Sequence, residues 1–280
     1  MRHACDMVAS PITTIWAWGN SVPPSADARG NGYADMTPAG VIGFAQAHSL
    51  TTVYLSVPWA ADQGGPIQDW LLETVSGLQA IGVRVLALGG DRSWVAEPAL
   101  AVWWARAALA SAPFDGLQFD LEPWVAGTEP SVYAPQLAAL YALVRSSVPL
   151  GSGALLADAP WWWAVTPTGG PGSPTVLEIT LPQLDGIAVV AFADHAAGSD
   201  GIIALAQPAA TAASVAGKPF TIGVETDTPE VAGGAQYTFF DEGSAVLEAE
   251  AGLVRDAFVG LAGYSGIAVE HLRSWRVLQA

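Results

Sequence analysis

The chain alternates between short segments rich in β-branched or aromatic residues and longer helical segments, and it does so eight times. Such alternation predicts a parallel sheet with helical crossovers. Eight units fit a closed (β/α)8 barrel, also called a TIM barrel, which typically needs about 250 residues. No linker interrupts the pattern, so we expect one domain over residues 1–280. The expected strands are Ile12–Trp18, Thr51–Val57, Val83–Leu88, one within Phe114–Trp124, Ala154–Ala157, Gly186–Phe192, Phe220–Val224 and Tyr264–Val269.

An open, doubly wound sheet is the alternative fold for this pattern. It would normally carry a glycine-rich phosphate turn directly after its first strand. Here the segment Trp18–Pro24, WGNSVPP, follows the first strand and does not match such a turn. The barrel is therefore the favoured prediction.

The fourth expected strand has one apolar and one polar face. Leu117 and its alternate neighbours are apolar, whereas Gln118, Asp120 and Glu122 share the opposite face. In a parallel barrel, the carboxyl ends of the strands hold the catalytic groups. Because Pro123 is expected to stop the strand just after the second acid, both carboxylates are predicted to emerge at that end.

This stretch resembles the strand-four signature D-G-x-D-x-D-x-E of the chitinase-like enzymes of glycoside hydrolase family 18. Asp115, Gly116, Asp120 and Glu122 match, and Gln118 replaces the first inner aspartate. The resemblance implies that Glu122 is the general acid and that Asp120 is the aspartate beside it. The third expected strand ends in Gly89-Gly90, which resembles the family's S-x-G-G with alanine in place of serine.

Two other strand ends depart from the family pattern. The family's strand-six motif is M-x-Y-D, and the nearest match here is Ala191–Asp194, with Phe192 in place of tyrosine. Glu270 and His271 stand where the family has a tryptophan at the end of strand eight. Both departures weaken the expectation of an N-acetyl sugar as substrate.

Acidic residues recur at the expected carboxyl ends of strands four to eight. Like charges gathered in one pocket must share protons or meet a ligand. The acids in these positions are Asp120, Glu122, Asp158, Asp194, Glu225 and Glu270.

Two glycosidase mechanisms fit these acids, and the sequence leaves both open. In the first, Glu122 protonates the leaving oxygen and Glu225 attacks the sugar, which needs carboxyl groups about 5–5.5 Å apart. This resembles retaining barrel glycosidases with an N-E-P motif, which place their two glutamates on strands four and seven. In the second, the substrate's acetamido group attacks and Asp120 orients it. We favour the first because Phe192 lacks the tyrosine hydroxyl.

Twelve tryptophans are present, several of them at expected strand ends. Flat aromatic rings at such positions suit the C–H faces of sugars. We therefore predict a carbohydrate substrate. The predicted substrate-binding residues are Trp16, Trp18, Gln118, Trp124, Asp158, Trp161, Phe192, Asp194, Glu270 and His271.

Charge and composition restrict the possible partners. The net charge of −16 disfavours nucleic acid, and no apolar run is long enough to predict a membrane span. Cys5 is the sole cysteine, so no disulfide framework is expected. The start Met1–Asp6 lacks the apolar core of a signal peptide. It suggests a cytoplasmic protein, unless a trimmed or misassigned start conceals a secretion signal.

Two other functions remain open at this stage. Asp120, Glu122, Glu225 and His271 would suit a divalent-metal-dependent hydrolase, although no H-x-x-x-H spacing is present. A carbohydrate-binding barrel without catalysis is the other alternative, and Gln118 in place of an aspartate would suit it. The glycosidase prediction itself requires no cofactor and no metal.

Overall fold

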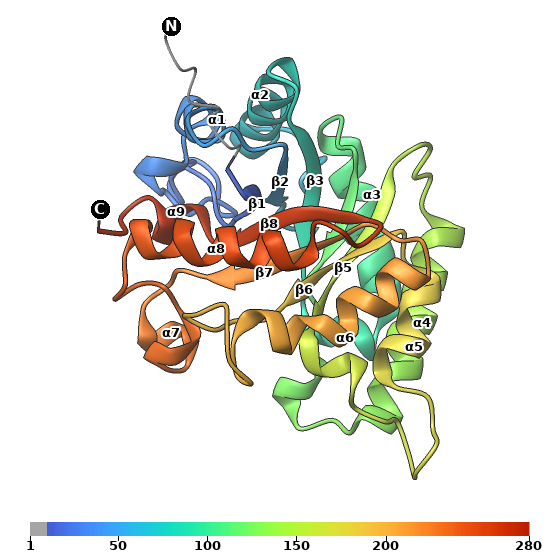
Figure 1. The fold of residues 1–280 in the computed structure, drawn as a ribbon. Helices are drawn as coiled ribbons and strands as arrows, with labels where there is room; N and C mark the ends of the chain where they lie inside the picture. Colours follow the sequence, from blue (N-terminus) through green and yellow to red (C-terminus); the bar gives the residue numbers. More distant parts are fainter. Residues whose placement is uncertain (1–9, 280) are drawn as a thin grey trace, which may run out of the picture.

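The computed structural model describes residues 10–279, and within them eight parallel strands close into a barrel surrounded by helices (Figure 1). Each strand pairs with its neighbour in sequence, and β8 closes the ring against β1. The (β/α)8 prediction is confirmed. The strands are β1 Ile12–Ala17, β2 Thr52–Ser56, β3 Arg84–Gly89, β4 Gly116–Phe119, β5 Ala154–Pro160, β6 Gly186–Val190, β7 Phe220–Glu225 and β8 Tyr264–Glu270.

The helices lie close to the segments that the sequence predicts. Five of them begin at a proline, which suits the first helical position because proline has no N–H to satisfy. Thr37 caps the first of these, its hydroxyl accepting a hydrogen bond from the Gly40 N–H at 3.1 Å. The helices are α1 Pro38–Ala47, α2 Pro66–Ala80, α3 Pro98–Ser111, α4 Pro130–Ser147, α5 Val176–Thr180, α6 Ile202–Val215, α7 Pro229–Ala232, α8 Ser244–Phe258 and α9 Leu272–Trp275.

Two apolar layers follow from the alternation of side chains along the strands. The larger layer lies between the strands and the helices. The smaller one fills the inside of the barrel, so the barrel is a packed core and not a pore. Its buried members are Trp16, Tyr54, Leu86, Leu88, Leu156, Ala188 and Ala268.

The structure corrects the predicted ends of three strands. β5 continues to Pro160, three residues beyond its predicted end at Ala157. β4 ends at Phe119, so the expectation that Pro123 ends the strand after the second acid is wrong. The chain leaves the sheet at Asp120, and a short 3-10 helix, Pro123–Ala126, follows. β6 ends at Val190, two residues before the predicted end. The helix α7 is an addition that the sequence pattern did not predict.

Asp115, the first residue of the strand-four motif, lies at the opposite end of the barrel from the acids. Its Oδ2 accepts hydrogen bonds from the Val85 N–H at 2.8 Å and from Gln79 Nε2 at 3.1 Å. Asp185 holds the start of β6 in the same way, through the Leu155 N–H at 2.8 Å. The Asp-Gly part of the motif therefore joins neighbouring strands and has no place in the site.

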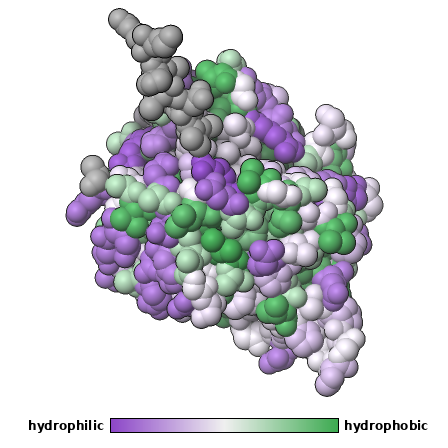
Figure 2. Space-filling model, viewed as in Figure 1, coloured by the Kyte–Doolittle hydropathy of each residue, from purple (hydrophilic) through white to green (hydrophobic). Residues whose placement is uncertain are grey.

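The surface around α6 and α8 mixes hydrophilic and hydrophobic residues (Figure 2). None of the helices described in residues 10–279 is long and apolar enough to cross a membrane. Cys5 and the start Met1–Asp6, on which the localisation prediction depends, lie outside the described residues.

Candidate active site

Strand register places four carboxyl groups in two neighbouring pairs at the carboxyl end of the barrel. Phe119 and Ala157 are partners in β4 and β5, so Asp120 and Asp158 follow them side by side. On the other side, Glu225 and Glu270 are themselves register partners in β7 and β8. Neighbouring strands are about 4.8 Å apart. Each strand thus contributes one acid at the same level.

Asp158 is held from both sides by buried donors. Its Oδ1 accepts a hydrogen bond from Gln118 Nε2 at 2.7 Å, and its Oδ2 accepts one from Trp16 Nε1 at 3.1 Å. Gln118 is fully buried, and its Oε1 has no partner among the described residues. These three side chains form the floor beneath the mouth of the barrel.

This floor corrects the prediction for Trp16. The residue is only 1% exposed, so its ring offers no open face to a sugar. Gly223 on β7 makes room for the ring, since a Cβ there would lie 3.2 Å from Trp16 Cη2. Trp16 lies near the end of β1, as the sequence pattern predicts, but its ring turns inward to hold Asp158.

Asp120 and Asp158 both bind protons more tightly than ordinary aspartates. Burial, with the charge of Glu122 added, raises the pKa of Asp120 to about 7. Burial and then the charge of Asp120 raise the pKa of Asp158 well above its usual value. Because the two carboxyls are neighbours, the second ionises only against the charge of the first.

The second pair, Glu225 and Glu270, also has one carboxyl group that ionises before the other. Burial raises the pKa of Glu225 to about 7, and hydrogen bonds from the Asp227 and Thr226 N–H groups, each 2.7 Å from Oε1, act in the opposite direction. Burial and then the charge of Glu225 raise the pKa of Glu270 well above its usual value. Trp18 Nε1 donates to Glu270 Oε1 at 2.6 Å. Glu225 therefore ionises before Glu270.

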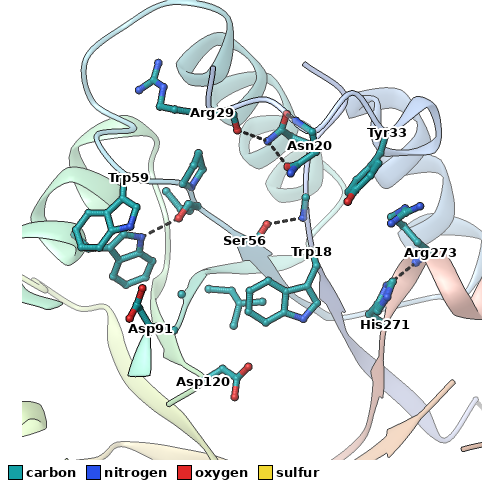
Figure 3. A pocket seen from close by; sticks show the side chains of 18 of the residues that line it. Trp18, Asn20, Arg29, Tyr33, Ser56, Trp59, Asp91, Asp120, His271 and Arg273 are labelled. Atoms are coloured by element: carbon teal, nitrogen blue, oxygen red, sulfur yellow. Dashed lines mark hydrogen bonds between the residues drawn. The ribbon is translucent and has the colours of Figure 1, made fainter. Parts of the chain in front are cut away.

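The main cavity, of about 680 Å³, lies over this mouth on the side of β1, β2, β3 and β8. Trp18, Asp120, Glu270 and His271 are the predicted site residues that line it. Figure 3 shows Trp18 and Asp120 on one side of the cavity and His271 on another. Aromatic rings and carboxyl groups thus meet in one hollow.

Glu122 lies beside this cavity and not within its lining. It lines a smaller hollow of about 270 Å³ that shares Gly90 and Asp120 with the main cavity. Gly90 is needed there, because a Cβ would lie 1.7 Å from the Asp120 carbonyl oxygen. Glu122 is exposed to solvent, yet partial burial still raises the pKa of its carboxyl.

His271 is fixed in one tautomer at the rim of the cavity. Its Nδ1 accepts a hydrogen bond from the Arg273 N–H at 3.1 Å, so the proton is on Nε2, which donates to Asp227 Oδ2 at 3.2 Å. Burial lowers the pKa of His271, although the Asp227 carboxylate acts to raise it. A neutral imidazole is therefore expected at neutral pH.

Four other predicted site residues lie away from the main cavity's described lining. Trp124 packs edge-on against Trp162, with ring centroids 5.1 Å apart, and Trp161 packs against the apolar core. Asp194 forms a hydrogen bond with His195 Nδ1. Phe192 is half-buried in the segment after β6.

Several residues that line the cavity were missed by the sequence analysis. Most lie on loops with no periodic pattern, and only Asp227, two residues after Glu225, continues the alternation of β7. The missed polar and aromatic residues are Asn20, Arg29, Asn31, Tyr33, Ser56, Asp91, Trp104, Asp227 and Arg273.

The two arginines among them are already engaged. Arg29 forms an ion pair with Asp27 at 2.6 Å. Arg273 has its Nε 3.4 Å from Asp35 Oδ1 and its guanidinium 3.7 Å from the ring centre of Tyr33.

The structure does not assemble the metal site that the sequence left open. Within residues 10–279, no group of three or more His, Cys, Asp or Glu side chains is arranged to hold a metal ion. The acids instead bond to N–H donors of Trp16, Gln118, Trp18 and the backbone. These contacts suit carboxyl groups that exchange protons.

Comparison with solved structures finds a similar barrel fold in several proteins, among them glycoside hydrolases. A chitinase of glycoside hydrolase family 18 from Pseudoalteromonas aurantia matches with a TM-score of 0.57 and 15% identity, over 94% of each chain. A family 5 xyloglucanase from Paenibacillus pabuli matches with a TM-score of 0.56 and 13% identity, over 93% of this chain and 90% of that one.

A third match belongs to a different functional class. The xylanase and alpha-amylase inhibitor protein from Scadoxus multiflorus matches with a TM-score of 0.50 and 12% identity, over 94% of this chain and 93% of that one. Comparisons with protein-family models and with curated sequences give no match. At these identities the likeness shows the barrel fold.

Proposed function

We propose that this protein is a glycoside hydrolase that cleaves glycosidic bonds in an oligo- or polysaccharide with retention of the anomeric configuration. The observation that carries this proposal is the main cavity, in which carboxyl groups of raised pKa meet aromatic rings. Glycosidases need one carboxyl that is protonated and one that is ionised at the working pH. The barrels of the matching chitinase and xyloglucanase support the same class of reaction.

Glu122 is the proposed general acid, with Asp120 beside it. Glu122 matches the motif's glutamate, and its raised pKa favours the protonated form that must donate to the leaving oxygen. Asp120 lines both the smaller hollow and the main cavity, so it lies between Glu122 and the larger space.

Glu225 is the proposed nucleophile. Two backbone N–H groups bond to its Oε1 and favour its ionised form, whereas its neighbour Glu270 remains protonated to higher pH. A glycosyl–enzyme ester on Glu225, opened by water, would retain the configuration. A carboxyl separation of about 5–5.5 Å between Glu122 and Glu225 in the working complex is part of this proposal.

The test is chemical rescue on a panel of aryl glycosides. Glu225→Ala should be inactive, and azide should restore turnover with formation of a glycosyl azide. The isosteric Glu225→Gln should be inactive and should gain little from azide, because its side chain still fills the space. Turnover of Glu225→Ala at the wild-type rate would remove Glu225 as nucleophile.

A carbohydrate-binding barrel without catalysis is the second candidate, favoured by Gln118 in place of the motif's aspartate. The match to a xylanase and alpha-amylase inhibitor protein supports this candidate. Binding of glycans without turnover on any of them would support this candidate and reject hydrolysis.

A further inference from the structure

The most exposed tryptophans of the chain stack on each other beside the main cavity. All twelve lie within residues 10–279, and of these Trp59 and Trp103 alone are exposed, at 37% and 46%. Their ring centroids are 5.0 Å apart and their planes are inclined by 28°. Trp59 belongs to the loop after β2 and lines the cavity, whereas Trp103 lies on α3.

This pair continues an aromatic row that begins inside the cavity. Trp59 meets Trp94 edge-on at 5.6 Å, and Trp94 lies 5.0 Å from Trp104. Trp94 and Trp104 are 2% exposed and belong to the core. Figure 3 shows Trp59 at the side of the cavity near Asp91. A row of ring contacts thus runs from the buried Trp94 and Trp104, which line the cavity, through Trp59 to the exposed Trp103 on α3.

Packing in the core explains the positions of Trp94 and Trp104, but it does not explain the exposed rings of Trp59 and Trp103. Trp104 is buried and donates a hydrogen bond to the Val57 carbonyl at 2.8 Å, whereas its neighbour Trp103 leaves nearly half of its surface in water. Exposing a large ring in this way forfeits the free energy of burying it. An adjoining ligand would recover part of that free energy.

We propose that Trp59 and Trp103 form an outer subsite for an extended, uncharged oligosaccharide that leaves the main cavity over α3. This inference rests on the proposed function. It adds that the substrates are oligosaccharides too long for the main cavity to hold alone. The aromatic row is continuous with the cavity, and indole rings suit the C–H faces of sugars. The net charge of −16 repels polyanionic chains, which leaves uncharged glycans as the fitting class.

The test measures binding, so it does not depend on turnover. Hexasaccharides and disaccharides of the cello- and chito-series, together with xyloglucan, are titrated by calorimetry into the wild type, Trp59→Ala and Trp103→Ala. The ratio of hexasaccharide to disaccharide affinity should fall about fivefold in each variant, by the worth of a stacked ring. Trp103→Phe should recover part of the loss. Leu253→Ala is the matched control, since Leu253 is 51% exposed on α8, and it should change nothing.

Three results would overturn the subsite. These are an unchanged affinity ratio in both tryptophan variants, no binding of any probe by the wild type, and a wild-type dimer that Trp103→Ala converts to a monomer. The last result would make the pair a contact between copies of the chain. Circular dichroism melting confirms that each variant folds.

The two proposals fail separately. If the hexasaccharides bind through the tryptophans but no glycan is cleaved, the outer subsite stands and glycoside hydrolysis falls. If aryl glycosides are cleaved but the affinity ratio does not depend on the tryptophans, hydrolysis stands and the outer subsite falls.

Discussion

Asp120 and Asp158 lie side by side across the seam between β4 and β5, one residue beyond the register pair Phe119 and Ala157. Only Asp158 of the two has buried N–H donors on both oxygens, from Gln118 and Trp16. This arrangement keeps a proton on the pair near neutral pH and gives the protein several measurable properties.

The first prediction concerns stability and pH. In the folded state the pKa of Asp120 is raised from 3.8 to about 7, so the folded protein holds a proton that the unfolded chain releases. The contribution of Asp120 to stability is therefore complete below about pH 4 and is lost as pH rises through about 7. Thermal melting from pH 4 to 8 should show a steeper decline for the wild type than for Asp120→Asn. Equal slopes would contradict the raised pKa.

The second prediction concerns the floor of the site. Trp16→Phe removes the N–H donor to Asp158, whereas Trp94→Phe makes the same change where Nε1 has no partner among the described residues. Because the raised pKa keeps Asp158 protonated near neutral pH, this is a hydrogen bond to a neutral group, which contributes about 0.5–1.5 kcal/mol. In urea unfolding, Trp16→Phe should thus lose about that much more free energy of unfolding than Trp94→Phe. Equal losses would mean that the Trp16 hydrogen bond has no net effect.

The third prediction is that Asp115, in the first half of the strand-four motif, contributes to stability and not to the reaction. Asp115→Ala should lower the free energy of unfolding by about 1–3 kcal/mol, because the Val85 N–H loses its partner. Asp185→Ala, which removes the equivalent contact to Leu155, should behave alike. Urea unfolding and turnover of the folded fraction check this together. A loss of turnover in Asp115→Ala without a loss of stability would give Asp115 a role in the reaction.

The fourth prediction concerns His271. Burial lowers its pKa, and Asp227 acts in the opposite direction. Asp227→Asn should therefore lower the pKa of His271 further, whereas Asp35→Asn should have a smaller effect because Asp35 is the last of the groups that act on it. An NMR titration of the imidazole measures both shifts. A rise in the His271 pKa in Asp227→Asn would contradict the hydrogen bond to Nε2.

The order of the strands and the acids at their ends followed from the sequence because both depend on local alternation. Phe220–Glu225 shows this well, since inward-facing Thr221, Gly223 and Glu225 are two residues apart. The ends of β4 and β6 were less predictable. Asp120 and Phe192 leave the sheet because of the loops that follow, and those loops have no periodic pattern.

The composition of the cavity was mostly beyond prediction for the same reason. Asn20, Asn31 and Tyr33 reach it from loops whose course depends on tertiary contacts. Trp16, in contrast, was predicted to lie in the site and does not line the cavity. Its position near a strand end suggested an open platform, but only the closed barrel shows that its ring packs inward against Gly223.

Hydrolysis of glycosidic bonds by the acids of the barrel mouth is the central claim, and turnover by Glu122→Gln tests it most directly. The wild type should cleave at least one substrate of a broad panel of aryl glycosides and polysaccharides. Glu122→Gln should reduce kcat by about 10²–10⁴-fold on that substrate while its affinity stays the same, because the amide cannot donate the acid's proton. The fall should be smaller on substrates whose leaving group needs no protonation. Wild-type kcat in Glu122→Gln on a substrate with a poor leaving group would contradict the account.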